Sequence, residues 1–582
     1  MDNITIKING REVSAPAGST ILDAANIAGA DIPTLCYMRK INEIGACRIC
    51  VVEVKGAKTL VTACVYPIAP NMEVFTNTPR VIESRRKTLQ LILSNHNRSC
   101  LSCVRSGNCE LQALCKKYGV DNEARYDGAR TPSIPDVTAP HMIRDNSKCI
   151  LCRRCVAVCK EVQNIGVIGA NARGFRTNIG SAFKMGLGNT SCTNCGQCIA
   201  VCPTGALTEK DYTKEVFAAI NDSEKVVLVQ TAPAVRAALG ECFGMPVGTD
   251  VQGKMVAALR RMGFDKVFDT TFGADLTIME EATELLGRIK NKGKLPLITS
   301  CSAGWVSYCE HYYPDMLGHL SSCKSPQQMF GAVAKSYWAE KMGVDPKNIF
   351  MVSVMPCTAK KFEITRPDEG RGDIPDVDVV ITTRELGRMI DAMGIRFADL
   401  PDEEFDSPLG SGTGAAVIFG ASGGVMEAAL RTASELITGK EAKSVDFKEV
   451  RSVSGIKEAS YKLGGKEIKV AVASGLKCAG ELLERIRNGE ADYQFVEIMA
   501  CPGGCVNGGG QPQVPYSIRN FVDIRAKRAE ALYSRDRAST LRKSHENPDV
   551  KELYAKYLGA PGSEKAHELL HTTYIRRSIN DN

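Results

Sequence analysis

The chain has 582 residues, of which 44% are hydrophobic and 24% charged, values typical of globular domains, and its length indicates several of them. Its net charge of +7 is distributed along the chain, which does not favour a nucleic-acid-binding surface. No apolar run reaches the ~18 residues of a membrane span, and the N-terminal segment has no apolar signal core. We therefore expect a cytoplasmic protein with neither nucleic acid nor membrane as a partner.

Cysteine is the unusual component of this sequence. There are 24 cysteines, and sixteen of them precede residue 203 in tight clusters. In a long chain without an export signal, so many thiols indicate metal ligands rather than disulfides. The sequence thus predicts an N-terminal part organised by metal, followed by a larger domain with a conventional core.

Residues 1–78 are predicted to form a small domain of strands and one helix. Residues 3–14 have the pattern of a hairpin around Asn9-Gly10. Four cysteines follow with the spacing Cys-x10-Cys-x2-Cys-x13-Cys: Cys36, Cys47, Cys50 and Cys64. Four thiolates can hold two irons, with zinc as the alternative. The pattern resembles the β-grasp 2Fe-2S domain that begins the large iron–sulfur subunit of respiratory complex I and related hydrogenases.

The next segment, residues 79–118, is expected to be an amphipathic helix that leads into a second cluster. Its candidate ligands follow the spacing His-x3-Cys-x2-Cys-x5-Cys: His96, Cys100, Cys103 and Cys109. The motif resembles the 4Fe-4S domain with one histidine and three cysteine ligands in the same families, and zinc is again the alternative. A neutral imidazole in place of an anionic thiolate favours the reduced state of such a cluster.

Residues 139–209 contain two cysteine runs, each with the spacing Cys-x2-Cys-x2-Cys-x3-Cys. This is the pattern of the two-cluster bacterial ferredoxin domain, in which the fourth cysteine of each run ligates the other cluster. One 4Fe-4S cluster would then have the ligands Cys149, Cys152, Cys155 and Cys202, and the other Cys159, Cys192, Cys195 and Cys198. Together with the two preceding centres, these two clusters give one 2Fe-2S and three 4Fe-4S clusters, a series of redox centres for electron transfer.

From residue 224 to 520 the composition changes to short, β-branched apolar runs separated by helical patterns. Such alternation predicts a large, two-lobed α/β domain with buried, parallel strands. Residues 521–582 are charged and helical, and we interpret them as a short tail that packs on the domain or docks a subunit.

Three cysteine-bearing segments lie at strand ends in the large domain: ITSCSAGWVSY (298–308), VMPCTAKKFE (354–363) and VEIMACPGGCVNGGGQP (496–512). In this order they resemble the signature segments of iron-only hydrogenases, and the resemblance extends over the whole chain. It implies an H-cluster, a 4Fe-4S cubane joined to a two-iron subcluster with CO, cyanide and a dithiolate. Cys357, Cys501 and Cys505 would be cubane ligands, with Cys505 bridging to the two irons.

The same resemblance implies roles for further residues of the pocket. Lys360 would hydrogen-bond a cyanide ligand. Met355 and Met499 would contact the subcluster, and Pro233 and Gln327 would line its pocket.

The first signature segment departs from the family pattern. The family usually has TSCCP, in which the first cysteine relays protons and the second ligates the cubane, whereas this chain has Cys301-Ser302-Ala303. By position, Cys301 would be the relay and Ser302 the fourth ligand. Alternatively, the loop shifts, Cys301 ligates the cubane and Ser302 takes part in proton transfer. We assign Cys301 as a ligand because a cubane prefers sulfur.

A proton path to this site is also implied by the resemblance. Glu281 and Glu284 are three residues apart, on one face of a predicted helix, and Ser321 completes the family's relay to the surface. Partly buried carboxyls of this kind would have raised pKa values, as proton exchange near neutral pH requires.

These patterns predict an iron-only hydrogenase that catalyses 2H⁺ + 2e⁻ ⇌ H₂. The long N-terminal array resembles the catalytic subunit of NAD(P)-linked, electron-bifurcating, multi-subunit hydrogenases. The chain has no flavin or nicotinamide fingerprint, so a flavin- and NAD(P)-binding subunit would exchange the electrons, with ferredoxin as a further partner. The alternative is a low-turnover hydrogen-sensing or electron-transfer subunit, suggested by the altered first segment.

Overall fold

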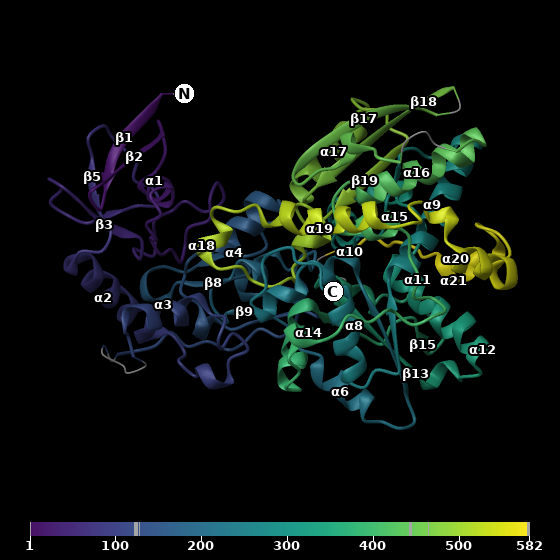
Figure 1. The fold of residues 1–582 in the computed structure, drawn as a ribbon, viewed down its shortest axis with the longest axis horizontal. Helices are drawn as coiled ribbons and strands as arrows, with labels where there is room; N and C mark the ends of the chain where they lie inside the picture. The colour runs from purple at the N-terminus through teal and green to yellow at the C-terminus, as the bar shows by residue number, and fades with distance from the viewer. Residues whose placement is uncertain (1, 122–125, 127, 442–444, 464, 579–582) are drawn as a thin grey trace.

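The computed structural model describes residues 2–121, 126, 128–441, 445–463 and 465–578. A small β domain at the N-terminus is joined by the cysteine-rich middle segment to a larger domain that contains both of the long sheets (Figure 1). Within the described residues, no helix combines the length and the apolar character that a bilayer crossing requires.

The N-terminal domain is a five-stranded sheet covered by one helix. Strands β1 (Asn3–Ile8) and β2 (Arg11–Pro16) form the predicted hairpin, and Asn9 and Gly10 both have positive φ, 53° and 81°, as the tight turn requires. Helix α1 (Ile21–Ile27) begins with a capping box formed by Thr20 and Asp23. The other strands are β3 (Val51–Val54), β4 (Val61–Thr62) and β5 (Glu73–Phe75), in the order β2-β1-β5-β3-β4.

The middle of the chain contains little regular structure beyond short elements that hold the cysteine loops. They are α2 (Pro79–Asn95), α3 (Glu110–Tyr118), α4 (Arg154–Ala157), α5 (Gln197–Ala200) and the strand pairs β6 (Met142–Arg144) with β9 (Leu207–Glu209) and β7 (Gly169–Asn171) with β8 (Asn178–Gly180). Cysteines make up a large share of the buried apolar cluster of the ferredoxin-like segment. Its fold therefore depends on what the cysteines bind.

The large domain is built on two four-stranded sheets. The first is parallel throughout, in the order β11 (Lys266–Asp269), β10 (Val226–Thr231), β13 (Ile349–Met355), β16 (Val379–Thr382). The second has the order β12 (Leu297–Ile298), β19 (Phe495–Met499), β18 (Lys466–Ser474), β17 (Gly455–Leu463), with only the β17–β18 pair antiparallel. The mixed α/β architecture agrees with the prediction, and parallel pairing brings the cysteine segments to the carboxyl edges of β12, β13 and β19.

The C-terminal tail and the short helix before it, α18 (Tyr516–Arg519), lie across the large domain. The helices of the tail are α19 (Ile524–Ala538), α20 (Pro548–Leu553) and α21 (Glu564–Leu570). In Figure 1 the tail runs from beside the middle segment to the far side of the molecule. Val550, Leu553, Leu569 and Leu570 belong to the same core as the parallel sheet. The tail thus packs within its own chain.

A buried ion cluster joins the ferredoxin-like segment to the large domain. Glu209 in β9 accepts hydrogen bonds from Arg384 Nη2 at 2.7 Å and Arg388 Nη1 at 2.6 Å, both in helix α14 (Thr383–Ala392). Burial opposes ionisation of Glu209, but the two guanidinium charges outweigh it and hold the pKa of this carboxyl well below its usual range.

We expect Glu209→Gln to lower the apparent melting temperature at neutral pH, because it leaves the buried Arg384 guanidinium without a carboxylate and removes one of the two carboxylates that pair with half-buried Arg388, a loss of about 3 kcal/mol. The stabilisation is complete above the ordinary glutamate pKa of about 4.3 and is lost as the pH falls through the depressed value of the folded protein. The difference from wild type should therefore shrink in acid. Exposed Glu215 in neighbouring helix α6 (Thr213–Ile220) provides the control, and an equal effect of Glu215→Gln would contradict the assignment.

Candidate metal centres and active site

Three cysteines, of which Cys501 is buried and Cys357 and Cys505 are half-buried, converge from two strand ends of the large domain. Cys357 follows β13, and Cys501 and Cys505 follow β19. Burial raises the pKa of each of these thiols, and the Cys357 charge raises the pKa values of Cys501 and Cys505 further. None of the three forms a disulfide. A buried group of unpaired thiols that disfavour one another's ionisation fits a cationic iron–sulfur unit, which would stabilise the thiolates.

The glycines around Cys505 allow the surrounding chain to approach closely. A Cβ added to Gly508 would lie 2.1 Å from Pro356 O, and one added to Gly509 would lie 2.4 Å from Cys195 O. Gly504 has φ +90°, and its Cβ would lie 2.6 Å from Ser422 N. Side chains at these positions would separate Cys505 from both the Cys357 loop and the ferredoxin-like segment.

Lys360 is buried beside these cysteines and has a carboxylate partner. Its Nζ donates to both carboxylate oxygens of Glu363 at 2.8 Å and to Cys301 O at 3.1 Å. Burial disfavours the ammonium, but the Glu363 carboxylate outweighs this effect and raises the pKa of Lys360. Gln327 Nε2 donates to the same carboxylate at 3.1 Å. Sequence reasoning missed Glu363 as a site residue, although Glu363 ends the segment VMPCTAKKFE. Its spacing of three residues from Lys360 was the available signal of an ion pair.

The other expected pocket residues lie at the same edge of the two sheets. Met355 ends β13 and Met499 ends β19, and both are buried. Pro233 begins helix α7 (Pro233–Arg236) directly after β10, and the N–H of Ala232 donates to Val354 O at 3.0 Å, which places Pro233 near the end of β13.

Cys301 and Ser302 have different surroundings. The Cys301 thiol is buried, which raises its pKa, and the nearest charged groups include Glu281 and Lys360. Ser302 Oγ accepts a hydrogen bond from the N–H of Ala500 at 3.1 Å, next to Cys501. Ser302 also begins helix α10 (Ala303–Tyr312), since its carbonyl accepts from Trp305 N. The Cys301 thiol thus lies near the Glu281 carboxyl group, whereas the Ser302 hydroxyl lies beside the segment that contains Cys501.

The three expected proton-path residues gather at helix α9 (Thr271–Lys290), although both carboxylate oxygens of Glu281 have no hydrogen-bond partner among the described residues. Burial raises the pKa of Glu281 to about 8, the Glu284 charge adds to the shift, and the nearby Ser321 hydroxyl opposes it. Ser321 Oγ donates to Glu284 Oε2 at 3.0 Å, and Arg288 Nη2 donates to Glu284 Oε1 at 2.6 Å. Glu281 therefore holds its proton near neutral pH, while Glu284 pairs with a cation.

Glu497 is a further buried carboxyl near Cys301 that sequence reasoning missed. It accepts hydrogen bonds from Gly423 N and Met426 N, each at 2.7 Å, at the start of helix α16 (Gly424–Thr438). Burial raises its pKa to about 7, although these N–H groups favour the anion. An acidic residue in the otherwise apolar run of β19 was the available signal.

In the N-terminal domain, the four predicted cysteines form two close pairs. Cys50 Sγ lies 3.2 Å from Cys64 Sγ, and the Cys36 thiol accepts from Cys47 N at 3.5 Å. Two thiol pairs match the requirements of two irons. Asn42 Nδ2 donates to Cys36 O at 2.7 Å and to Cys152 O at 3.0 Å, so this loop adjoins the ferredoxin-like segment.

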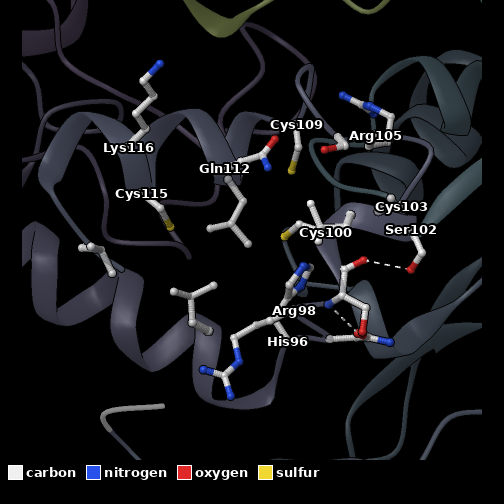
Figure 2. A pocket seen from close by; sticks show the side chains of 18 of the residues that line it. His96, Arg98, Cys100, Ser102, Cys103, Arg105, Cys109, Gln112, Cys115 and Lys116 are labelled. Atoms are coloured by element: carbon white, nitrogen blue, oxygen red, sulfur yellow. Dashed lines mark hydrogen bonds between the residues drawn. The ribbon is translucent and has the colours of Figure 1, made fainter. Parts of the chain in front are cut away.

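His96 and its three cysteines line a cavity of about 620 Å³ (Figure 2). Burial is the main cause that lowers the pKa of His96 to about 4, and its Nδ1 has no hydrogen-bond partner among the described residues. A neutral imidazole with a free nitrogen is the form that ligates iron. Cys115 lines the same cavity, and Gly205 closes it, since an added Cβ would lie 2.7 Å from Cys103 Sγ.

The cysteines of the ferredoxin-like segment form two neighbouring groups. After burial, the charge of Cys202 is among the causes that raise the pKa values of Cys149, Cys152 and Cys155. The charges of Cys195 and Cys159 act in the same way on Cys192 and Cys198. The fourth cysteine of each run therefore lies beside the first three of the other run, as crossed ligation requires.

The second of these groups adjoins the cysteines of the large domain. The Cys195 charge contributes to the raised pKa of Cys501. Thr358 Oγ1 donates to Asn194 O at 2.9 Å, and Gln197 Nε2 donates to Asn507 O at 2.7 Å. These bonds fix both cysteine loops against the segments around Cys357 and Cys505.

Family models match nearly the whole chain. They describe a 2Fe-2S iron-sulfur cluster binding domain (residues 1–79), the NADH-ubiquinone oxidoreductase-G iron-sulfur binding region (85–124), a 4Fe-4S dicluster domain (148–206), the C-terminal domain of the iron-only hydrogenase large subunit (225–509) and the iron hydrogenase small subunit (522–577). The matched domains carry 2Fe-2S, 4Fe-4S and hydrogenase cluster chemistry.

Curated relatives and solved structures agree with these matches. The chain is 52% identical to the NADP-reducing hydrogenase subunit HndD of Solidesulfovibrio fructosivorans, over 99% of this chain and 100% of the relative. It is 45% identical to iron hydrogenase 1 of Clostridium pasteurianum, over 98% and 99%. A structure of the [FeFe]-hydrogenase HydA1 from Chlamydomonas reinhardtii covers 63% of this chain and 99% of its own, with 45% identity and a TM-score of 0.56. The chain belongs to the iron-only hydrogenases and is a hydrogenase, as the sequence predicted.

We expect His96→Cys to make the midpoint potential of one 4Fe-4S cluster more negative, because an anionic thiolate replaces a neutral imidazole. An EPR-monitored redox titration measures this shift. Cys115→Ser, on the same cavity, should leave all cluster potentials unchanged. Potentials that do not move in His96→Cys would exclude His96 as a ligand.

Proposed function

We propose that this hydrogenase holds its H-cluster at Cys357, Cys501 and Cys505 and exchanges electrons with a partner through four N-terminal clusters. The convergence of the three thiols beside Lys360 is the observation that carries the proposal. When bound, the two-iron unit supplies the making and breaking of the H–H bond. Met355, Met499, Pro233 and Gln327 would line its pocket.

We propose Ser302 as the fourth cubane ligand and Cys301 as the proton relay, in place of the sequence-based assignment of Cys301 as a ligand. Ser302 Oγ lies at the Ala500–Cys501 segment, whereas the Cys301 thiol lies among Glu281, Lys360 and Cys505. A thiol beside a buried, protonated carboxyl suits proton transfer. A serine oxygen binds iron less well than a thiolate, so one corner of this cubane would be weakly held.

Protons would move between Cys301 and the surface through Glu281, Ser321 and Glu284. The raised pKa of Glu281 lets it hold a proton at neutral pH and release it to a neighbour, and the Ser321 hydroxyl, which donates to Glu284, would pass the proton between the two carboxyl groups. Lys360, kept charged by Glu363, would orient a cyanide ligand.

Electrons would reach the catalytic centre through a branched path. The 2Fe-2S loop adjoins Cys152 through Asn42, and the histidine-ligated site adjoins Cys202, whose carbonyl accepts from Arg105 Nη1 at 3.0 Å. Both branches therefore lead to the cluster of Cys149, Cys152, Cys155 and Cys202. The other ferredoxin cluster then connects this junction with Cys501.

We propose that a flavin- and NAD(P)-binding subunit docks at the 2Fe-2S end, with ferredoxin as a further partner. HndD is described as a subunit of an NADP-reducing hydrogenase. In this chain, Ile44, Val65 and Tyr66 expose apolar surface next to Cys47 and Cys64, which suits docking of a protein partner. The cytoplasm is the compartment we expect from the sequence. A low-turnover sensor is not favoured by the full-length similarity to catalytic hydrogenases.

Infrared spectroscopy of matured, anaerobic protein tests the site together with three variants. We expect bands of CO and cyanide ligands in wild type and Cys301→Ala, with turnover reduced at least about 100-fold in Cys301→Ala, as for loss of an acid–base group. Ser302→Ala should lose or alter the EPR signal of the cubane, and Ser302→Cys should retain the cluster.

Ser307→Ala is the matched control, because Ser307 is a buried serine of helix α10. Absence of CO and cyanide bands from matured wild type would refute the H-cluster. Loss of the cubane in Cys301→Ala but not in Ser302→Ala would make Cys301 the ligand.

A further inference from the structure

The C-terminal tail places a histidine at the outer end of the proposed proton path. His571 follows helix α21, and its backbone pairs with Cys323. Lys324 N donates to Leu570 O and Thr572 N donates to Ser322 O, both at 2.8 Å. The tail therefore holds His571 in register with the segment that contains Ser321 and Ser322.

Hydrogen bonds connect the imidazole with Glu284. His571 Nδ1 lies 2.8 Å from Ser322 Oγ, and Ser322 Oγ donates to Glu284 Oε2 at 3.3 Å. Ser321 Oγ donates to this same carboxylate oxygen at 3.0 Å. One oxygen of Glu284 thus receives the Ser321 hydroxyl and the Ser322 hydroxyl, and the Ser322 hydroxyl leads on to His571.

The other nitrogen of His571 is fixed by a buried carboxylate. Nε2 lies 3.2 Å from Glu280 Oε2, and Glu280 also accepts from Tyr554 and from Gly562 N. The side chain of His571 is 8% exposed, and exposed His567, on the surface of α21, stacks on it with ring centroids 3.9 Å apart. His571 thus lies between the exposed ring of His567 and the buried hydrogen-bond partners Glu280 and Ser322.

We propose that His571 is the outer proton-transfer residue of the relay, exchanging protons with water and passing them through the Ser322 hydroxyl to Glu284. For proton uptake, the imidazolium gives its Nδ1 proton to Ser322 Oγ while the Ser322 hydroxyl proton moves to Glu284 Oε2, which leaves a neutral imidazole. Hydrogen oxidation reverses these transfers. The inference rests on the proposed relay through Glu281, Ser321 and Glu284.

The charge of His571 depends on groups from every element around it. The titratable and charged groups that face it, or face its direct partners, are Glu280, Glu284, Arg288, Cys323, Tyr554 and His567. Arg288 pairs with Glu284 Oε1, which leaves Oε2 to the two serines.

The test uses holoenzyme of the full chain and dye-linked H₂ uptake over a range of pH. We expect His571→Gln to lower turnover by about tenfold, less than the full effect of an acid–base group because Glu284 retains some contact with water. The pH–rate profile should lose one ionisation, and the solvent isotope effect should increase. Infrared bands of CO and cyanide should remain unchanged.

Ser322→Ala should give the same loss with His571 intact, and added imidazole should restore part of the activity of His571→Ala. His545→Gln is the matched control, because His545 lies in the same tail and also contacts a helix glutamate, Glu435, at 3.0 Å, away from the relay. If His571→Gln and Ser322→Ala both keep the turnover and pH profile of wild type while Glu281→Gln loses turnover, the role of His571 is overturned and the relay itself stands. Wild-type turnover in Glu281→Gln as well would refute the relay itself.

Discussion

The close approach of the chain around Gly196 to the chain around Gly509 is the constraint on which the rest of the structure depends. A Cβ on Gly509 would lie 2.6 Å from Gly196 Cα, and a Cβ on Gly196 would lie 2.2 Å from Thr358 Oγ1. This contact brings Cys195 next to Cys501 and so joins the electron-transfer segment to the catalytic domain. Electron transfer needs short distances between centres, and backbone-to-backbone contact provides the shortest separation that a folded chain allows. The Glu209 ion cluster and the Gln197–Asn507 bond then hold the two parts in this position.

Charge is arranged differently in the two parts of the molecule. The N-terminal loops bury many thiols, so their stability depends on the metal centres that would compensate the thiolates. The large domain instead pairs its buried charges within the protein, as in Lys360 with Glu363 and Arg431 with Asp536. The Glu281 carboxyl has a raised pKa and no hydrogen-bond partner among the described residues. A carboxyl of this kind can take up and release a proton near neutral pH.

Much of the fold and of the site could be predicted from local sequence. The hairpin at Asn9-Gly10 and the parallel strands follow from turn chemistry and β-branched runs, and the cysteine spacings indicated which thiols would meet. The roles of Glu497 and His571 could not be predicted in this way. Each depends on packing between segments distant in sequence, such as His571 with Ser322, 249 positions apart. The surroundings of Cys301 and Ser302 likewise depend on how the loop meets Ala500, which spacing does not determine.

Our central claim is that electrons leave the catalytic centre through the N-terminal clusters. Freeze-quench EPR after exposure of oxidised holoenzyme to H₂ tests this claim most directly. With H₂ as the sole reductant and no dye, we predict that the signals of the reduced 2Fe-2S and 4Fe-4S clusters develop within about one turnover time, since the cysteine groups adjoin one another from Cys501 to Cys36. N-terminal clusters that stay oxidised under H₂, in protein that oxidises H₂ with an added dye, would contradict the account.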